Sequence, residues 1–260
     1  MAQSAGVLLK KKFGQHFLRD YDVLAKIIQH AQLTEADSVL EIGCGDGFLT
    51  RALLDEPIKK LCSFEIDQQW ATQVKNSIQD DRFELKIQDI LTIQNDFFVH
   101  DGLWKVVANL PYNITFPILE IFRLQSDYLD RGIIMIQEEV AQKLAKKAGN
   151  GKDYGFVSLF YQYYFDFTLL DKVLPASFFP MPNVVSRLIA FRPKKERPAI
   201  EDAENFWNFI KLVFKQPRRT LKNNLAESSL KISQLSEEVL QKRAQQLDFQ
   251  QLLQLWHAIK

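Results

Sequence analysis

The stretch Val106-Val107-Ala108-Asn109-Leu110-Pro111-Tyr112-Asn113 predicts a buried strand that ends in a rigid, polar turn. Its first residues are apolar and partly β-branched, which is typical of a parallel strand covered on both faces. Ligands of open α/β sheets bind at the carboxyl ends of such strands. There Asn109 offers hydrogen-bonding groups, and Tyr112 offers a flat face on which a nucleobase could stack. An ordinary strand, turn and helix would carry the same residues, so the neighbouring segments must decide.

A second strand-like segment runs from Ser38 to Ile42 and enters a glycine-rich turn. Glycines at alternate positions, 43 to 47, would let the backbone approach a ligand closely. Their G-x-G-x-G spacing is not the dinucleotide pattern G-x-G-x-x-G. The acids Glu41 and Asp46 would repel a pyrophosphate, whereas a cationic or zwitterionic ligand tolerates them. The loop therefore favours a positively charged ligand over a phosphate.

Two more strand-like segments each end near an acid. Residues 60–67 end in two carboxylates, Glu65 and Asp67. Glu65 follows Gly43 by 22 positions, close to the spacing at which an acid holds both ribose hydroxyls. A solvated acid at a strand end is the alternative for Glu65. Asp89, at the end of residues 83–90, could accept a hydrogen bond from an adenine amino group. The alternation of strands and helices predicts an α/β fold with a doubly wound parallel sheet.

Six separated motifs occur in order along the chain. They are Gly-Gln-His-Phe-Leu at 14–18, Glu-Ile-Gly-Cys-Gly at 41–45, Glu-Ile-Asp at 65–67, Gln-Asp-Ile at 88–90, Asn-Leu-Pro-Tyr-Asn at 109–113 and Phe-Phe-Pro-Met-Pro-Asn-Val at 178–184. Together they resemble the ribosomal RNA adenine dimethyltransferase family, in particular its bacterial small-subunit branch. The glycine loop departs from that family's common pattern at Cys44 and Asp46, which leaves the cofactor assignment intact.

The resemblance implies a Rossmann-like sheet of the S-adenosylmethionine-dependent methyltransferases, followed by a small all-α domain. The character of the chain changes after the basic, proline-containing segment 192–198, where we expect a linker. Residues 1–194 would form the catalytic domain and residues 195–260 a helical RNA-binding domain. Within the first of these, the aromatic run 160–167 is predicted to be a packed strand rather than a stacking platform.

The implied reaction transfers methyl groups from S-adenosylmethionine to the exocyclic N6 of two adjacent adenosines in a 3′-terminal hairpin loop of small-subunit rRNA. By resemblance, such an enzyme also has a role in small-subunit biogenesis. The cofactor site implied by the resemblance consists of Gln15, His16, Leu18, Glu41, Gly43, Gly45, Glu65, Ile66, Asp89, Ile90 and Asn109. Among these, Glu41 would lie near the methionine amino group.

The implied catalytic residues are Asn109, Leu110, Pro111, Tyr112 and Phe178. The Asn109 oxygen and a backbone carbonyl at Leu110 or Pro111 would accept hydrogen bonds from the target amine, which favours a tetrahedral nitrogen. Tyr112 and Phe178 would sandwich the base once it leaves its stack. No general base or metal is expected, because the sulfonium is already an excellent leaving group and the protein mainly aligns donor and acceptor.

Basic residues are concentrated at the start of the predicted helical domain. Between residues 194 and 222, eight basic residues outnumber four acidic ones, which gives +4 against +1 for the whole chain. A solvated helix face explains part of this excess, but a footprint on RNA phosphates explains its concentration better. The predicted RNA-binding residues are Lys146, Lys147, Lys215, Arg218, Arg219 and Lys222.

The remaining composition is that of an ordinary globular protein, with 47% hydrophobic and 25% charged residues. Cys44 and Cys62 show neither a disulfide framework nor metal-ligand spacing, so buried thiols in a reducing cytoplasm are expected. No run approaches the ~18 apolar residues of a membrane span. The sequence predicts a soluble cytoplasmic monomer whose partner is small-subunit rRNA within the immature 30S subunit.

Two other functions remain open at this point. The large-subunit rRNA methyltransferases that confer macrolide resistance share the Asn-Leu-Pro-Tyr turn and the glycine loop. The chain could also be a mainly non-catalytic ribosome assembly factor or RNA-binding module. The intact Asn109 and glycines argue against the second alternative, and the Gly-Gln-His-Phe-Leu opening argues against the first.

Overall fold

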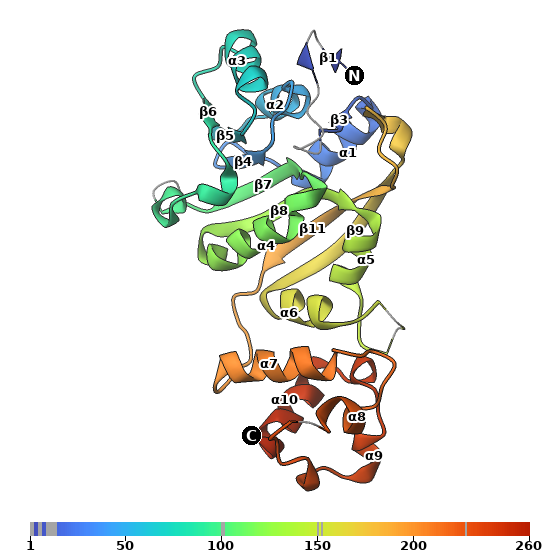
Figure 1. Cartoon of the computed structure of the whole chain (residues 1–260). Coiled ribbons are helices and arrows are strands. Elements are labelled where there is room, and N and C mark those ends of the chain that lie inside the picture. Colours follow the sequence, from blue (N-terminus) through green and yellow to red (C-terminus); the bar gives the residue numbers. More distant parts are fainter. Residues whose placement is uncertain are drawn as a thin grey trace. The chain divides into compact units, whose positions relative to one another are not determined.

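A computed structural model describes residues 3–4, 7–8, 15–99, 102–149, 151, 153–226 and 228–260. The chain divides into two compact units (Figure 1). Unit 1 consists of Met1–Ala141 and Asp166–Pro193, and unit 2 of Gln142–Phe165 and Lys194–Lys260. Gly14, which begins the first motif, lies outside the described residues.

A seven-stranded sheet in the order β6-β5-β4-β7-β8-β11-β9 forms the centre of unit 1. Its strands are β4 (Ser38–Ile42), β5 (Lys60–Glu65), β6 (Phe83–Ile87), β7 (Trp104–Asn109), β8 (Leu129–Gln137), β9 (Phe165–Val173) and β11 (Ser186–Pro193). The pairs from β6 to β8 are parallel, whereas β11 runs antiparallel to β8. The predicted α/β class is confirmed, but the sheet is mixed rather than wholly parallel.

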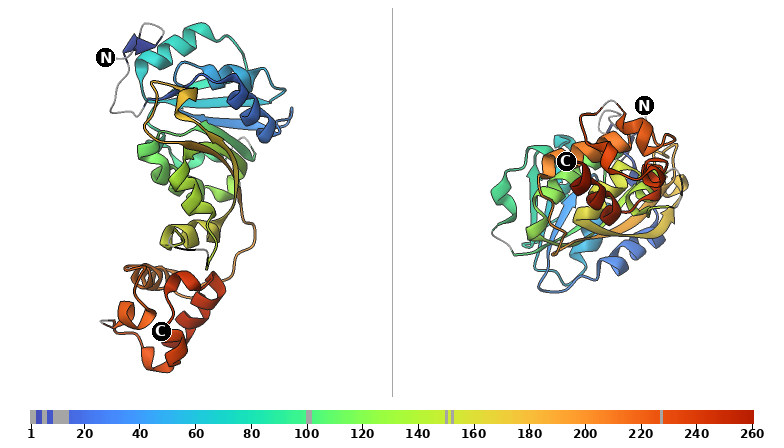
Figure 2. Two further views of the ribbon diagram at one scale, coloured as in Figure 1. Left: turned by 90° about the vertical axis from the view of Figure 1, so that its right-hand side faces the viewer. Right: turned by 90° about the horizontal axis from the view of Figure 1, so that it is seen from below.

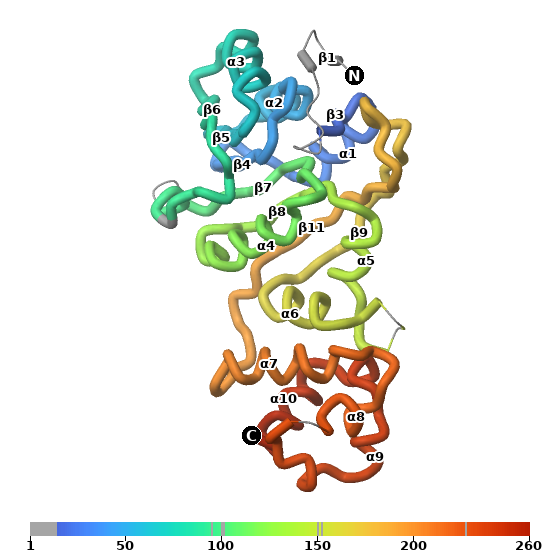
Figure 3. Tube along the Cα trace, in the orientation of Figure 1, coloured from blue at the N-terminus to red at the C-terminus, as the bar shows by residue number. Residues whose placement is uncertain are grey.

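The connections of the sheet create one reversal, which can be followed along the tube in Figure 3. From β4 the chain moves outward to β5 and β6, then returns to β7 on the other side of β4. All five residues of β4 are buried, as a central parallel strand requires. The gap between the carboxyl ends of β4 and β7 is therefore the position where doubly wound sheets bind ligands.

Helices lie on both sides of this sheet, with α1 and α4 on opposite sides in Figure 2. The helices that begin in unit 1 are α1 (Tyr21–Ala31), α2 (Phe48–Leu54), α3 (Gln68–Ser77), α4 (Thr115–Leu124) and α5 (Glu138–Ala145), with the 3-10 turns η2 (Ile90–Thr92), η3 (Asn95–Phe98), η4 (Tyr112–Ile114), η5 (Ser126–Tyr128) and η6 (Pro175–Ser177). Asp20 caps α1 by accepting hydrogen bonds from the backbone N–H groups of Asp22 and Val23. The apolar residues of α1 recur at helical spacing and are buried.

Two short antiparallel pairs complete the strands of unit 1. The pairs are β1 (Gln3–Ser4) with β2 (Val7–Leu8), and β3 (Phe17–Leu18) with β10 (Phe178–Phe179). In the second pair Leu18 lies opposite Phe178, and both side chains belong to the hydrophobic core of unit 1. This pairing fastens the amino-terminal segment to a loop that lies far along the chain.

Unit 2 is helical and has its own aromatic core. Its helices are α6 (Phe156–Tyr164), α7 (Ala203–Val213), α8 (Leu221–Leu225), α9 (Glu237–Leu240) and α10 (Phe249–Ile259), with the 3-10 turns η7 (Ile232–Gln234) and η8 (Ala244–Gln246). Among the described residues, no helix is long and apolar enough to cross a membrane.

The segment predicted as a packed strand at 160–167 is mostly helical, so that prediction was wrong. Phe156, Phe160 and Tyr163 recur at helical spacing along α6, and each ring contacts Trp207 of α7. The aromatic residues of this run recur both at alternate positions, as in a strand, and three or four positions apart, as in a helix. The contacts with Trp207 favour the helix. The same packing places residues 142–165 in unit 2, whereas the sequence prediction assigned them to the first domain.

We expect Gly132→Ala in β8 to destabilise unit 1 by about 1–3 kcal/mol. A Cβ at this position would lie 2.2 Å from Cε1 of Phe191, a ring that is only 2% exposed. Urea unfolding of the variant measures the loss. Gly155→Ala is the control, because a Cβ there meets nothing within 4 Å; equal stability of the two variants would contradict the prediction.

Candidate functional site

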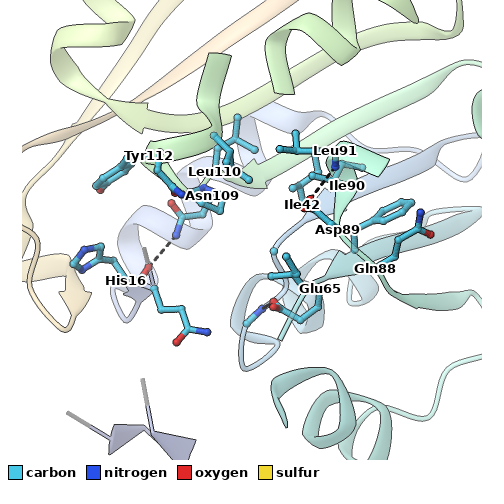
Figure 4. A pocket seen from close by; sticks show the side chains of 18 of the residues that line it. His16, Ile42, Glu65, Gln88, Asp89, Ile90, Leu91, Asn109, Leu110 and Tyr112 are labelled. Carbon is cyan, nitrogen blue, oxygen red and sulfur yellow. Dashed lines mark hydrogen bonds between the residues drawn. The ribbon is translucent and has the colours of Figure 1, made fainter. Parts of the chain in front are cut away.

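A cavity of about 270 Å³ opens at the carboxyl ends of β4, β5 and β7 (Figure 4). Twelve residues predicted from the sequence line it: Gln15, His16, Gly43, Gly45, Glu65, Ile66, Asp89, Ile90, Asn109, Leu110, Pro111 and Tyr112. They come from five separate segments of the chain. The reversal of strand order between β4 and β7 brings them together.

Glu65 ends β5 with a buried carboxyl that bonds two strand-end loops. Its Oε2 accepts a hydrogen bond from the Gly45 N–H at 2.9 Å, and its Oε1 accepts one from the Asp67 N–H at 2.8 Å. Burial raises the pKa of Glu65, against the lowering effect of these N–H groups. Each carboxylate oxygen can accept more than one hydrogen bond. Glu65 therefore keeps capacity for the two hydroxyls of a ribose.

Gly45 permits a very close approach between the glycine loop and the amino-terminal segment. Its φ is +54°, and a Cβ at this position would lie 2.4 Å from Cε1 of Phe17. Phe17 packs edge-on against Trp70 of α3, with ring centroids 4.8 Å apart. A side chain at residue 45 would therefore strain the backbone and displace the Phe17 ring.

Asn109 is held by the backbone of the amino-terminal segment. Its Nδ2 donates a hydrogen bond to the carbonyl oxygen of His16 at 3.2 Å, shown as a dashed line in Figure 4. The amide group of Asn109 is thereby oriented with its nitrogen committed. Among the described residues, no hydrogen bond to its oxygen is found, so this oxygen can accept one at the cavity wall.

The two backbone carbonyls that follow Asn109 differ in availability. The Pro111 oxygen accepts hydrogen bonds from Ile114 N at 3.2 Å and Thr115 Oγ1 at 3.4 Å, which close the turn η4. Within the described part of the chain, the Leu110 oxygen has no such bond, while the Leu110 N–H donates to the Met135 oxygen. The geometry therefore favours the Leu110 carbonyl as the second acceptor.

Tyr112 presents a ring whose position is fixed at both ends of the side chain. Its hydroxyl shares a 2.6 Å hydrogen bond with Ser186 Oγ, and its ring lies nearly parallel to that of His16, with centroids 6.0 Å apart. The His16 Nδ1 is in turn 2.7 Å from the Pro180 oxygen. Burial raises the pKa of Tyr112, so its phenol remains neutral near pH 7.

Asp89 and its apolar neighbours form the end of the cavity nearest β6. The Asp89 Oδ1 accepts a hydrogen bond from Leu91 N at 2.9 Å, which starts the turn η2. Ile66 and Ile90 line the same part of the cavity, where they can flank a planar ring. A carboxylate between apolar side chains suits a heterocycle that carries an amino group.

Three predicted residues do not reach the cavity wall. Leu18 and Phe178 are 5% and 4% exposed and pack together in the core, because the β3–β10 pair turns both side chains inward. The predicted sandwich of Tyr112 with Phe178 is therefore not formed, and His16 is the ring that faces Tyr112. Glu41 is 1% exposed and also lies off the cavity lining.

Glu41 instead forms a buried network behind the glycine loop. Its Oε2 accepts hydrogen bonds from Thr50 Oγ1 at 2.8 Å and Ser63 Oγ at 2.5 Å. Its Oε1 is buried without a hydrogen-bond partner among the described residues. Burial raises the pKa of Glu41 to about 7, which outweighs the two hydroxyl donors.

Seven lining residues were not predicted from the sequence, namely Phe17, Ile42, Phe64, Gln88, Leu91, Asn113 and Ile114. Most of them are direct neighbours of predicted residues. Their burial pattern could not be read from a motif, because it depends on which strand ends meet. The clearest available signal was membership of one of the six motifs, which holds for Phe17, Ile42, Gln88 and Asn113.

The six predicted RNA-binding residues all belong to unit 2, including the two that precede α6. Five of them are exposed and Lys146 is half-buried. One charge is locally balanced, because Lys222 Nζ lies 2.9 Å from Glu237 Oε1. Sequence separation therefore concealed that Lys146 and Lys147 belong to the same unit as the C-terminal basic residues.

A family model and two similar proteins all indicate a ribosomal RNA methyltransferase. A family model described as ribosomal RNA adenine dimethylase matches residues 6–258. The small-subunit rRNA methyltransferase A of Geobacter metallireducens is 38% identical over 239 residues, which cover 89% of this chain and 86% of that protein. That of Leuconostoc mesenteroides is 34% identical over 275 residues, with coverage of 98% and 91%.

Solved structures share the fold. A dimethyladenosine transferase from Plasmodium falciparum superposes with a TM-score of 0.79 at 23% identity, covering 92% of this chain and 96% of that one. The 23S rRNA methyltransferase ErmE gives a TM-score of 0.69 at 23% identity, with coverage of 92% and 98%. The chain therefore shares the fold of these two enzymes.

We expect Glu41→Gln to flatten the pH dependence of stability. Because the pKa of Glu41 is about 7 in the folded chain and 4.5 ordinarily, its proton stabilises the fold fully below pH 4.5, and this stabilisation is lost as pH rises through 7. The loss is on the order of 3 kcal/mol. Urea unfolding from pH 5 to pH 8 should show a smaller decline for the variant; parallel curves would refute the assignment.

Proposed function

Because this chain belongs to the ribosomal RNA adenine dimethylase family, we propose that the cavity of unit 1 is its active site. The chain is an S-adenosylmethionine-dependent rRNA adenine dimethyltransferase. Its proposed reaction forms N6,N6-dimethyladenosine in small-subunit rRNA; the family description supports dimethylation of adenine, and the names of the relatives support the small-subunit rRNA. The observation that supports this site most directly is the Asn109 amide, whose nitrogen donates to the His16 carbonyl and whose oxygen has no hydrogen bond from the described residues.

The cavity suits S-adenosylmethionine by its charge and its hydrogen-bonding groups. Glu65 would hold the ribose hydroxyls, and Asp89 would accept a hydrogen bond from the adenine amino group. Among the described lining residues there are acids but no lysine or arginine, which fits a ligand that carries a sulfonium and an ammonium group. When bound, S-adenosylmethionine supplies a methyl group on a positively charged sulfur.

The acceptor end of the cavity is formed by the residues after β7. The Asn109 Oδ1 and the Leu110 carbonyl would accept the two N–H bonds of the adenosine amine. Conjugation keeps that amine planar and weakly nucleophilic, and two fixed acceptors favour its tetrahedral form, in which the lone pair is available. Tyr112 would stack on the base once it has left the RNA helix.

Alignment of two groups accounts for the main catalytic task. A well-oriented pair of reactants can lower the barrier by roughly 7–11 kcal/mol without any acid or base. The attacking nitrogen becomes positively charged during the transfer and loses its proton afterwards to water. We therefore assign no general base and no metal to the mechanism.

The finer parts of the proposal concern the substrate and its setting. We propose that the partner is the immature 30S subunit, that the enzyme works as a monomer in the cytoplasm, and that the targets are two adjacent adenosines of the 3′-terminal hairpin loop. The exposed basic residues of unit 2 would contact RNA phosphates. The relatives named for the small subunit do not favour the large-subunit or non-catalytic alternative.

The deciding experiment is transfer of tritium from labelled S-adenosylmethionine to undermethylated small subunits, with large subunits assayed in parallel. Release of labelled dimethyladenosine from the small-subunit RNA is the expected result. Label confined to large-subunit RNA would overturn the substrate. Cofactor binding without transfer to either would instead indicate a non-catalytic factor.

We expect Asn109→Ala to reduce the transfer rate by about 10²–10³-fold, the usual cost of losing one fixed transition-state contact. Cofactor affinity should fall far less, because the alanine removes a group directed at the amine. Single-turnover transfer and calorimetric titration with S-adenosylmethionine separate the two quantities. Equal losses in both would remove Asn109 from the acceptor site.

Glu65→Gln should show the opposite pattern. The amide keeps the size of the side chain but has one acceptor oxygen fewer, so the ribose contacts and one loop contact are lost. We expect the dissociation constant for S-adenosylmethionine to rise at least tenfold, as for a lost charge-assisted hydrogen bond. An unchanged dissociation constant would refute the assigned role.

A further inference from the structure

We propose that Arg19 and Asp46 form a latch that holds an amino-terminal strap, residues 15–19, over the cofactor cavity. Both are positioning residues, since neither lines the cavity itself. The inference goes beyond the proposed function by assigning a control on cofactor retention, and it relies on that function for the identity of the cofactor. No motif of the family suggested the pair, because Asp46 is one of the two departures in the glycine loop.

The strap contacts the loops that follow β4, β5 and β7. Gln15 Nε2 donates to Asp67 Oδ2 after β5 at 3.2 Å, and the His16 oxygen accepts from Asn109 at the end of β7 at 3.2 Å. Phe17 packs directly on Gly45 of the loop after β4. The strap therefore joins the three loops, and its residues Gln15, His16 and Phe17 form part of the cavity lining.

The ion pair at the end of the strap is short and partly shielded from water. Arg19 Nη2 lies 2.6 Å from Asp46 Oδ2, and the two side chains are 32% and 18% exposed. The Arg19 guanidinium also lies 5.3 Å from the centre of the Phe17 ring. A partly desolvated, charge-assisted contact of this kind exceeds the usual worth of an exposed surface pair.

The position of Arg19 is set from the other side by the loop before β10. Its backbone N–H donates to the Ser177 oxygen at 2.8 Å. The guanidinium is thereby aimed from a fixed backbone toward the glycine loop, and a second bond from Arg19 Nη1 to the Leu18 oxygen at 2.8 Å supports this direction. The ion pair therefore joins a backbone segment that is already held by Ser177 to the glycine loop.

The strap also links cofactor retention to the acceptor site. Asn109 is oriented by the His16 carbonyl, which belongs to the strap. Release of the latch would loosen that carbonyl and with it the Asn109 amide. Loss of the ion pair should therefore raise the KM for cofactor and lower kcat together. A substitution that only lowers the stability of the fold elsewhere would not change both constants.

The test measures binding of S-adenosylmethionine and S-adenosylhomocysteine to the full chain and to Arg19→Ala, Asp46→Asn and the double variant. We expect each single variant to raise both dissociation constants roughly three- to tenfold, mainly through faster dissociation. The double variant should be no weaker than either single one, because both changes break the same contact. Raising the ionic strength from about 0.05 to about 0.5 M should weaken binding in the parent and much less in the variants.

Lys26→Ala is the matched control. Lys26 Nζ forms an ion pair with Asp171 Oδ1 at 2.8 Å in the same unit, with side chains 48% and 32% exposed, away from the strap. This control should bind both ligands as the parent does. Unchanged or additive effects of the Arg19 and Asp46 substitutions would overturn the latch, whereas failure of the parent chain to bind S-adenosylmethionine would overturn the proposed function instead.

Discussion

The cavity depends on one buried carboxylate at the end of β5. Glu65 accepts one N–H from the glycine loop and one from the loop that begins α3, so a single side chain fixes the separation of two strand ends. Its burial opposes ionisation, and the two N–H groups oppose this effect. Without the Glu65 carboxylate, the hydrogen bonds that join the glycine loop to the loop before α3 through this side chain would be lost.

The two ends of the cavity differ in kind. In the proposed assignment, the cofactor end presents acids whose spare lone pairs would accept hydrogen bonds from hydroxyl and amino groups, while the acceptor end presents a neutral amide and a backbone carbonyl. Both ends thus offer hydrogen-bond acceptors, which suits the binding of a cation and an amine. In the proposed mechanism the rate enhancement comes from fixed geometry, and the described hydrogen bonds of Asn109, Tyr112 and Glu65 to other parts of the chain would supply that rigidity.

The sequence predicted the parts of the site that depend on local chemistry. Glu65, Asp89 and Asn109 stand at the ends of strands that hydrophobic runs identify, and the parallel sheet then brings those ends together. It failed where the outcome depends on distant packing. Phe178 was assigned to the cavity, but its pairing with Leu18 turns it into the core. The residues 160–164 became helical because Trp207 supplies a surface that fits helical spacing.

The β3–β10 pair has a consequence for the order in which contacts of the amino-terminal segment form during synthesis. The His16 ring contacts the carbonyl oxygen of Pro180, a residue that lies 164 positions further along the chain. A nascent chain that has emerged through β7 already contains Gly43, Glu65, Asp89 and Asn109, yet it lacks the strand and the carbonyl that hold the amino-terminal segment. The contact that holds His16 from the β10 side can therefore form only after residue 180 has been synthesised, when most of unit 1 is already present.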